Sequence, residues 1–208
     1  MMPRQLIKSR MGRRIKSQFG HPRGLMGRFT SRMMVRLNAE RNEWAVSLLD
    51  AQPGDYVLEI GFGPGQALQQ VAQRVTNGYV AGIDVSELMF QQAKARNAVA
   101  IHDGRLDLRL GSVDDLPFES DSFDKVYAVN SLHHWPDQAA GLAEIHRVLK
   151  PGGKLLVISQ PRWVQSEDEI RPMADKLAAL LTVAGFHDIQ TEFKPLQPVT
   201  AIALHAHK

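Results

Sequence analysis

Residues 57–65 contain an acid and three regularly spaced glycines, and this is the pattern in the chain that points most directly to a ligand-binding site. An apolar run carries an acid, Glu59, and leads into Gly61, Gly63 and Gly65, which are separated by single residues. Glycine has no Cβ and tolerates positive φ, so such a turn lets the backbone pass close to a ligand. The residues that follow predict a helix whose free N–H groups face the same ligand.

The glycine spacing narrows the kind of ligand. A dinucleotide-binding turn would place its third glycine at position 66, which is Gln66 in this chain. A phosphate-binding Walker loop ends in Gly-Lys-Ser/Thr, and no such ending follows. The pattern therefore disfavours a pyrophosphate ligand, and with it a nicotinamide oxidoreductase.

Two more acids follow predicted strands. Asp84 ends the next strand, nineteen residues after Gly65, and a carboxylate at that position can accept both hydroxyls of a ribose. Asp114 follows the third strand, where it can accept a hydrogen bond from the exocyclic amine of a purine. Together these acids describe a site for adenosine without phosphates.

The elements that must position these residues alternate between strands and helices. This alternation implies right-handed βαβ units in a doubly wound parallel sheet, with ligands beyond the C-terminal ends of the strands. The expected strands are 56–60, 79–84, 106–110, 123–129, 154–159, 186–193 and 199–207. The expected helices are 31–50, 65–75, 86–98, 138–149 and 168–184, with a turn at 151–153.

Six blocks in order resemble the class I S-adenosylmethionine-dependent methyltransferases, and most of all their small-molecule group, which includes the ubiquinone/menaquinone methyltransferases. The blocks are Glu59–Gly65, Gly82–Ser86, Asp114–Phe118, Ser122–Val126, Asn130–Trp135 and Arg147–Gly153, and the resemblance covers about residues 45–208. It implies an α/β fold: a Rossmann-like seven-stranded sheet of order 3-2-1-4-5-7-6, the last strand antiparallel, with helices on both faces.

The resemblance also implies a cofactor, S-adenosylmethionine, with S-adenosylhomocysteine as its product, and a role for each matching residue. The three glycines pass under the methionine part, Glu59 lies near its amino group, and Asp84 holds the ribose. Adenine is surrounded by Val85 and Met89, its edge is met by Val113 and Asp114, and Asn130 lines the methyl-transfer chamber.

His133 and His134 follow the fourth strand, where the methyl acceptor is expected. Imidazole has a suitable pKa for a general base, but the His-His-Trp segment also fits a structural feature of the family's loop, and we favour that interpretation. Adjacent histidines on a non-helical segment point apart, so we expect no shared metal, and no other spacing in the chain suggests a zinc site.

Composition divides the chain into a basic arm and an acidic body. Residues 1–41 hold eleven Lys or Arg and one acid, whereas the remainder holds 14 bases and 21 acids. We expect a helical arm or lid over residues 1–50 and one cofactor-binding domain over 51–208. The absence of cysteine excludes disulfides, thiolate metal sites and cysteine nucleophiles.

The basic arm is consistent with three roles. The arm could pack on the body or on a second copy in a homodimer, touch an anionic membrane surface near a lipophilic acceptor, or contact nucleic acid. Nucleic acid is disfavoured because the Asn/Asp-Pro-Pro-Tyr/Phe motif of many amino-group methyltransferases is replaced by Asn130-Ser131-Leu132-His133.

Two functions are consistent with the whole sequence. We expect a cytoplasmic or membrane-peripheral enzyme acting on a small organic acceptor; the alternative is a regulatory protein that binds the cofactor without turnover.

Overall fold

The computed structural model describes residues 39–164 and 166–208, which form one seven-stranded sheet of order β3-β2-β1-β4-β5-β7-β6. β7 runs antiparallel to both of its neighbours, whereas the other adjacent pairs are parallel. The expected order and antiparallel last strand are confirmed. The strands are β1 (Tyr56–Ile60), β2 (Tyr79–Asp84), β3 (Leu106–Leu110), β4 (Phe123–Val129), β5 (Leu149–Ser159), β6 (His187–Lys194) and β7 (Ala201–His207).

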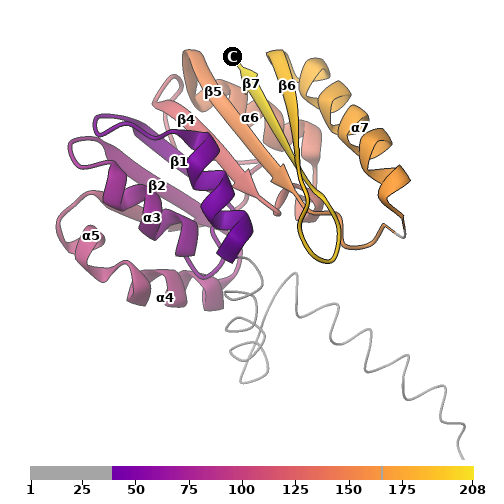
Figure 1. Cartoon of the computed structure of the whole chain (residues 1–208). Coiled ribbons are helices and arrows are strands. Elements are labelled where there is room, and N and C mark those ends of the chain that lie inside the picture. The colour runs from indigo at the N-terminus through magenta and orange to yellow at the C-terminus, as the bar shows by residue number, and fades with distance from the viewer. Residues whose placement is uncertain (1–38, 165) are drawn as a thin grey trace, which may run out of the picture.

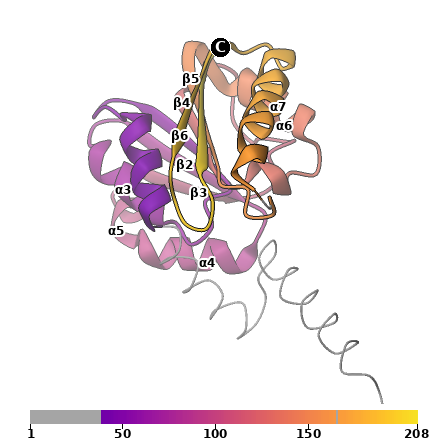
Figure 2. The same ribbon diagram turned by 45° about the vertical axis from the view of Figure 1, so that its right-hand side comes forward.

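Helices cover both faces of this sheet (Figure 1). Figure 2 shows the sheet more nearly edge-on, with α3 on one side and α6 and α7 on the other. Residues 39–49 are helical as well. The other helices are α3 (Gln66–Arg74), α4 (Glu87–Arg96), α5 (Ala98–His102), α6 (Gln138–Val148) and α7 (Ile170–Val183), with short 3-10 turns η1 (Leu132–His134) and η2 (Glu167–Glu169).

Two hydrophobic clusters hold the layers together. Successive residues of a strand point to opposite faces, so Leu58 of β1 faces α6 and α7 while Val57 faces α3 and the helical residues 39–49. Helices 39–49, α3 and α4 contribute Ala45, Val46, Leu49, Leu68, Val71 and Ala93 to one cluster. Helices α6 and α7 contribute Leu142, Ile145, Val148, Ile170, Ala174 and Leu181 to the other.

Helix boundaries follow local chemistry. The Ser86 hydroxyl accepts a hydrogen bond from the Met89 N–H and so caps α4 as predicted. The expected continuation to residue 98 is interrupted at Asn97, whose side-chain amide donates to the carbonyls of Ala93 and Gly65. Asn97 therefore ends α4 and ties it to the turn after β1.

The strand order places one edge of the sheet in position for ligand binding. The chain runs outward from β1 to β2 and β3, then returns to β4 on the other side of β1. Such a switch point leaves a crevice beyond the carboxyl ends of the two strands that meet there. Two segments that contain predicted site residues, 61–65 and 130–135, directly follow the ends of β1 and β4.

The predicted helix over residues 31–50 is observed from residue 39 to residue 49, and the rest of it lies outside the described residues. The same holds for most of the basic arm, so its three roles stay predictions. None of the helices within the described part of the chain has both the length and the apolar character needed to cross a membrane.

Candidate functional site

A cavity of about 510 Å³ lies at the switch point, within the size range of ligand sites. Its glycine-loop end is formed by residues that follow β1 and β2, and its histidine end by residues that follow β4 and β5. Ten of the twelve predicted site residues line it: Glu59, Gly61, Gly63, Asp84, Val85, Met89, Val113, Asn130, His133 and His134. The other two, Gly65 and Asp114, are not among the lining residues.

The three glycines of the turn all have positive φ, but they are required for two different reasons. A Cβ at Gly61 would lie 2.5 Å from the Cβ of Ser131, and one at Gly65 would lie 2.7 Å from the Cβ of Ala93. A Cβ at Gly63 would meet no protein atom within 4 Å. Gly61 and Gly65 thus permit close packing, whereas Gly63 leaves open space beside the cavity that it lines.

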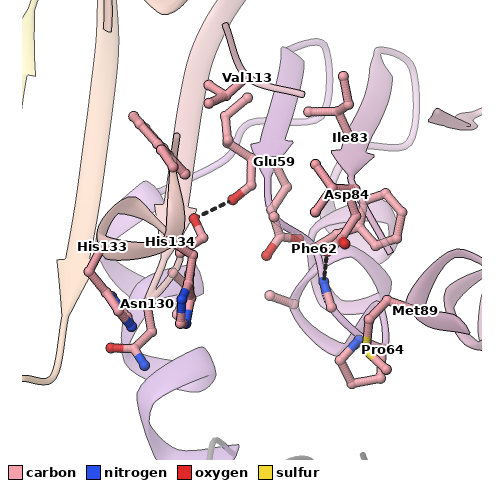
Figure 3. Close-up of a pocket in the computed structure, with 18 of the residues that line it drawn as sticks. Glu59, Phe62, Pro64, Ile83, Asp84, Met89, Val113, Asn130, His133 and His134 are labelled. Carbon is pink, nitrogen blue, oxygen red and sulfur yellow. Dashed lines mark hydrogen bonds between the residues drawn. The ribbon is translucent and has the colours of Figure 1, made fainter. Parts of the chain in front are cut away.

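Asp84 closes the glycine-loop end from the neighbouring strand. One of its carboxylate oxygens accepts a hydrogen bond from the Gly63 N–H at 2.8 Å (Figure 3), and the other accepts one from the Ser86 N–H at 2.9 Å. Each carboxylate oxygen has a second lone pair. Backbone donors therefore hold this carboxylate in one orientation at the cavity wall.

Glu59 is a buried acid on β1 that lines the same cavity. Burial raises its pKa to about 8, although the Tyr127 hydroxyl, which donates to it at 2.7 Å, acts in the opposite direction. The nearby negative charge of Asp84 adds to the rise of this pKa. Glu59 is accordingly protonated at neutral pH and would ionise if a positive charge came close to it.

Part of the cavity wall is apolar. Met89 and Val113 are buried and Val85 is half exposed, and all three line the cavity. Met89 and Asp84 lie on the same side of the close-up (Figure 3). Asp114 directly follows Val113 in the chain but is exposed. The backbone turn after β3 therefore presents the valine to the cavity and the acid to solvent.

Three flat side chains meet at the histidine end. The rings of His133 and His134 lie 3.9 Å apart, and the ring of Trp163 lies 4.7 Å from that of His133. The expectation that the two histidines point apart is wrong, because η1 is a tight helical turn rather than an extended segment. In the described segments, no group of three or more His, Asp or Glu is placed to hold a metal ion.

His133 has an unusual environment for a base. Burial, His134 and the positive charge of Arg41 together lower the pKa of His133 to about 4. The imidazole is therefore neutral over the whole physiological range. A neutral ring at this place can accept or donate a hydrogen bond, but it is a weak acceptor of a full proton.

A buried amide network connects the two strand ends at this side. The Asn130 carboxamide oxygen accepts from the Gln160 N–H at 2.8 Å, and Asn130 itself has a φ of 57°. The Gln160 side chain donates to the carbonyls of Gln197 and Val199. Its oxygen accepts from Arg41, which is only 2% exposed, and from Arg162.

Gln160, Arg41 and Arg162 were not among the site residues predicted from the sequence. Gln160 directly follows β5, and a polar residue at the carboxyl end of a parallel strand was the available signal. For Arg41 the signal was a cation among the apolar residues Trp44, Ala45 and Leu48 of one helix. Neither signal indicates that the two side chains meet.

Comparison with known proteins identifies the family. Residues 58–157 match the family described as a methyltransferase domain. The methyltransferase YdaC of Bacillus subtilis (strain 168), itself uncharacterized, is 35% identical over 177 residues, which are 85% of this chain and 96% of that protein. The ubiquinone/menaquinone biosynthesis C-methyltransferase UbiE of Geotalea daltonii is 32% identical over 124 residues, which are 58% of this chain and 53% of that protein.

A crystal structure of an S-adenosylmethionine-dependent methyltransferase from Aquifex aeolicus has the same fold, with a TM-score of 0.68 and 20% identity over 83% of this chain and 92% of that one. The chain belongs to the class I S-adenosylmethionine-dependent methyltransferases of the small-molecule group. Its methyl donor is S-adenosylmethionine, which leaves as S-adenosylhomocysteine.

The residues of the glycine-loop end fit this cofactor. Gly63 leaves room for a ligand to approach the backbone, and the oriented Asp84 carboxylate can accept hydrogen bonds from hydroxyls. The apolar wall suits an adenine ring, and the nearby Glu59 suits an ammonium group. No basic cradle for a pyrophosphate is needed, since this cofactor contains no phosphate.

Proposed function

We propose that this methyltransferase acts on a small organic acceptor that binds at the histidine end of the cavity. The observation that carries the proposal is that one continuous cavity joins the glycine-loop end to the histidine end. A donor held at the first end and an acceptor at the second would meet beside Asn130, at the end of β4.

We assign the cofactor contacts residue by residue. Asp84 would accept from the ribose hydroxyls, Gly63 would let the methionine part approach the backbone, and Glu59 would lie near its amino group. Val85, Met89 and Val113 would pack around the adenine. Gly65 would act indirectly, by allowing α4 to pack under the turn, and the placement of Asp114 supports at most a contact at the rim.

When bound, S-adenosylmethionine supplies an electrophilic methyl group. The chain's own contribution is alignment, because an in-line displacement depends strongly on the orientation of its reactants. The low pKa of His133 supports a role in holding the acceptor by a hydrogen bond rather than in removing a full proton from it. Asn130 and His134 would line the same chamber.

Cofactor binding and turnover test the proposal separately. Calorimetry should show that the folded protein binds S-adenosylmethionine and S-adenosylhomocysteine. A panel of phenols, carboxylic acids, amines and quinols should then include acceptors that increase the release of S-adenosylhomocysteine. A folded protein that binds neither compound would overturn the cofactor site, and tight binding without turnover on any acceptor would favour the regulatory alternative.

A further inference from the structure

The histidine end of the cavity concentrates positive charge. Arg162 lines the cavity, and Arg41 lies buried beside it; both donate to the side-chain oxygen of Gln160. The two carbonyls that accept from the Gln160 amide nitrogen leave its oxygen pointing at the guanidinium groups. The network therefore holds two cations next to each other at one wall.

This arrangement makes the wall electrostatically positive. Burial and the charge of Arg162 lower the pKa of Arg41 to about 10, so both groups are cationic at neutral pH. The two acids that line the cavity, Glu59 and Asp84, belong to its glycine-loop end.

Arg41 is buried and Arg162 is half-buried, so both guanidinium groups lose hydration, and their like charges repel each other. An anion that enters such a site relieves both costs, and a guanidinium is well suited to a carboxylate because its planar fork matches the two oxygens. The positive wall is thus better matched to a negatively charged ligand than to a neutral one.

Aromatic side chains stand next to these cations. Trp163 follows Arg162 in the chain, is 52% exposed and lines the cavity. Its ring is in contact with His133, which in turn lies against His134; the two pairs of rings are tilted by 51° and 45° rather than stacked. The half-exposed indole ring of Trp163 favours a planar ligand over a branched aliphatic one, because aromatic rings stack on its face.

We infer that the methyl acceptor is a planar aromatic acid whose carboxylate binds Arg162, with Arg41 behind it, and whose ring lies against Trp163. This inference rests on the proposed function and names the chemical class of its acceptor. The carboxylate serves as the handle for binding. The group that receives the methyl is a separate substituent of the same ring, directed toward Asn130.

Matched pairs of probes can test this inference in the protein saturated with S-adenosylhomocysteine. The probes are 4-hydroxybenzoate against 4-hydroxybenzamide, and 2-naphthoate against 2-naphthamide, measured by calorimetry near neutral pH. Each pair has the same ring and nearly the same size but differs in charge. We expect the acid of each pair to bind about tenfold more tightly than its amide.

Amino-acid substitutions can show which residue causes the preference for the acid over the amide. Arg162→Gln should remove it, and Arg162→Lys should retain part of it. Arg171→Gln, which removes an exposed cation of α7 that does not line the cavity, should leave it unchanged. Trp163→Leu should weaken the acid and the amide by a similar factor, because it removes the ring and not the charge.

Three results would overturn the inference. The first is that no acid probe binds, or that acids and amides bind equally. The second is that Arg162→Gln, or Arg162→Lys if the glutamine variant does not fold, keeps the full preference. The third is that Arg162→Gln weakens S-adenosylhomocysteine about tenfold but leaves 5′-methylthioadenosine unchanged, which would assign the guanidinium to the cofactor's own carboxylate. If wild type binds no S-adenosylhomocysteine, the proposed function fails instead.

Discussion

The two ends of the cavity are built in different ways. At the glycine-loop end, the key side chain is held by backbone groups: Asp84 accepts from the N–H groups of Gly63 and Ser86. At the histidine end, the key cations are held by another side chain: Arg41 and Arg162 both donate to Gln160, whose amide nitrogen donates in turn to two backbone carbonyls, and His133 lies against Trp163. A backbone-held site suits a constant ligand, whereas a site made of side chains can change with the acceptor.

The contacts also differ in their separation along the chain. Asp84 reaches a residue 21 positions away, between consecutive parallel strands. Arg41 reaches Gln160 across 119 positions. The first contact follows from strand order alone, while the second depends on how the helical residues 39–49 dock on the sheet. Substitutions at each end can therefore separate the two ends experimentally.

Asp84→Ala should have the largest effect. It removes the carboxylate that we assign to the ribose and leaves the N–H groups of Gly63 and Ser86 without this acceptor. We expect the affinity for S-adenosylmethionine to fall about 100-fold, in line with the loss of charged hydrogen bonds. Calorimetry measures this change, and Asp114→Ala is the matched control, since Asp114 is exposed outside the cavity lining. Equal losses in both variants would restore Asp114 to the adenine site.

Gly65→Ala and Gly63→Ala should separate packing from ligand binding. A Cβ at Gly65 would overlap Ala93, so Gly65→Ala should lower the free energy of unfolding by about 2 kcal/mol. Gly63→Ala should cost only the strain of its left-handed backbone, about 1 kcal/mol, yet weaken the cofactor more than Gly65→Ala does. Urea unfolding and calorimetry together test the pair; the reverse pattern would contradict the assignment of Gly63.

Glu59→Gln should change the pH dependence of stability. The pKa of Glu59 is raised from 4.5 to about 8 in the folded protein, so the protonated acid favours the folded state at low pH. As pH rises from 4.5 towards 8, the unfolded chain loses this proton first and stability falls.

The glutamine variant can still accept from Tyr127 but has no proton to lose. Its free energy of unfolding should therefore rise relative to wild type by about 1.4 kcal/mol for each pH unit between 4.5 and 8, although it should bind the cofactor more weakly. Urea unfolding at several pH values measures this difference. Glu43→Gln, an exposed glutamate on the helical residues 39–49, is the control and should run parallel to wild type.

His133→Gln should have the smallest effect. With a pKa of about 4, His133 is neutral at physiological pH, and its loss should lower kcat by no more than about tenfold, as expected for one neutral hydrogen bond. The pH profile of kcat/KM should show no step that belongs to this residue between neutral pH and mildly acid pH. A step near the ordinary histidine pKa that disappears in His133→Gln, but not in the exposed His102→Gln, would make His133 a general base after all.

The strand pattern shows how far local sequence determines this fold. β3 and β4 begin and end at the predicted residues, because alternating and apolar runs bounded by turns leave little choice. β5 begins at Leu149 rather than at residue 154, since Leu149 pairs with Phe123 across the sheet. That pairing depends on the neighbouring strand β4, so residues 149–153 by themselves do not predict that the strand begins at Leu149.

The sequence by itself determined the sheet, the glycine turn and the acid at the end of β2, because parallel strands bring their carboxyl ends to one edge whatever surrounds them. Only the tertiary structure decided which side chains form the histidine end of the cavity, opposite the glycine-loop end. The docking of the helical residues 39–49 buries Arg41 against Gln160, and the turn of η1 brings the ring of His133 within 3.9 Å of that of His134. Such contacts depend on the angles between packed layers, which side-chain packing sets across the whole core.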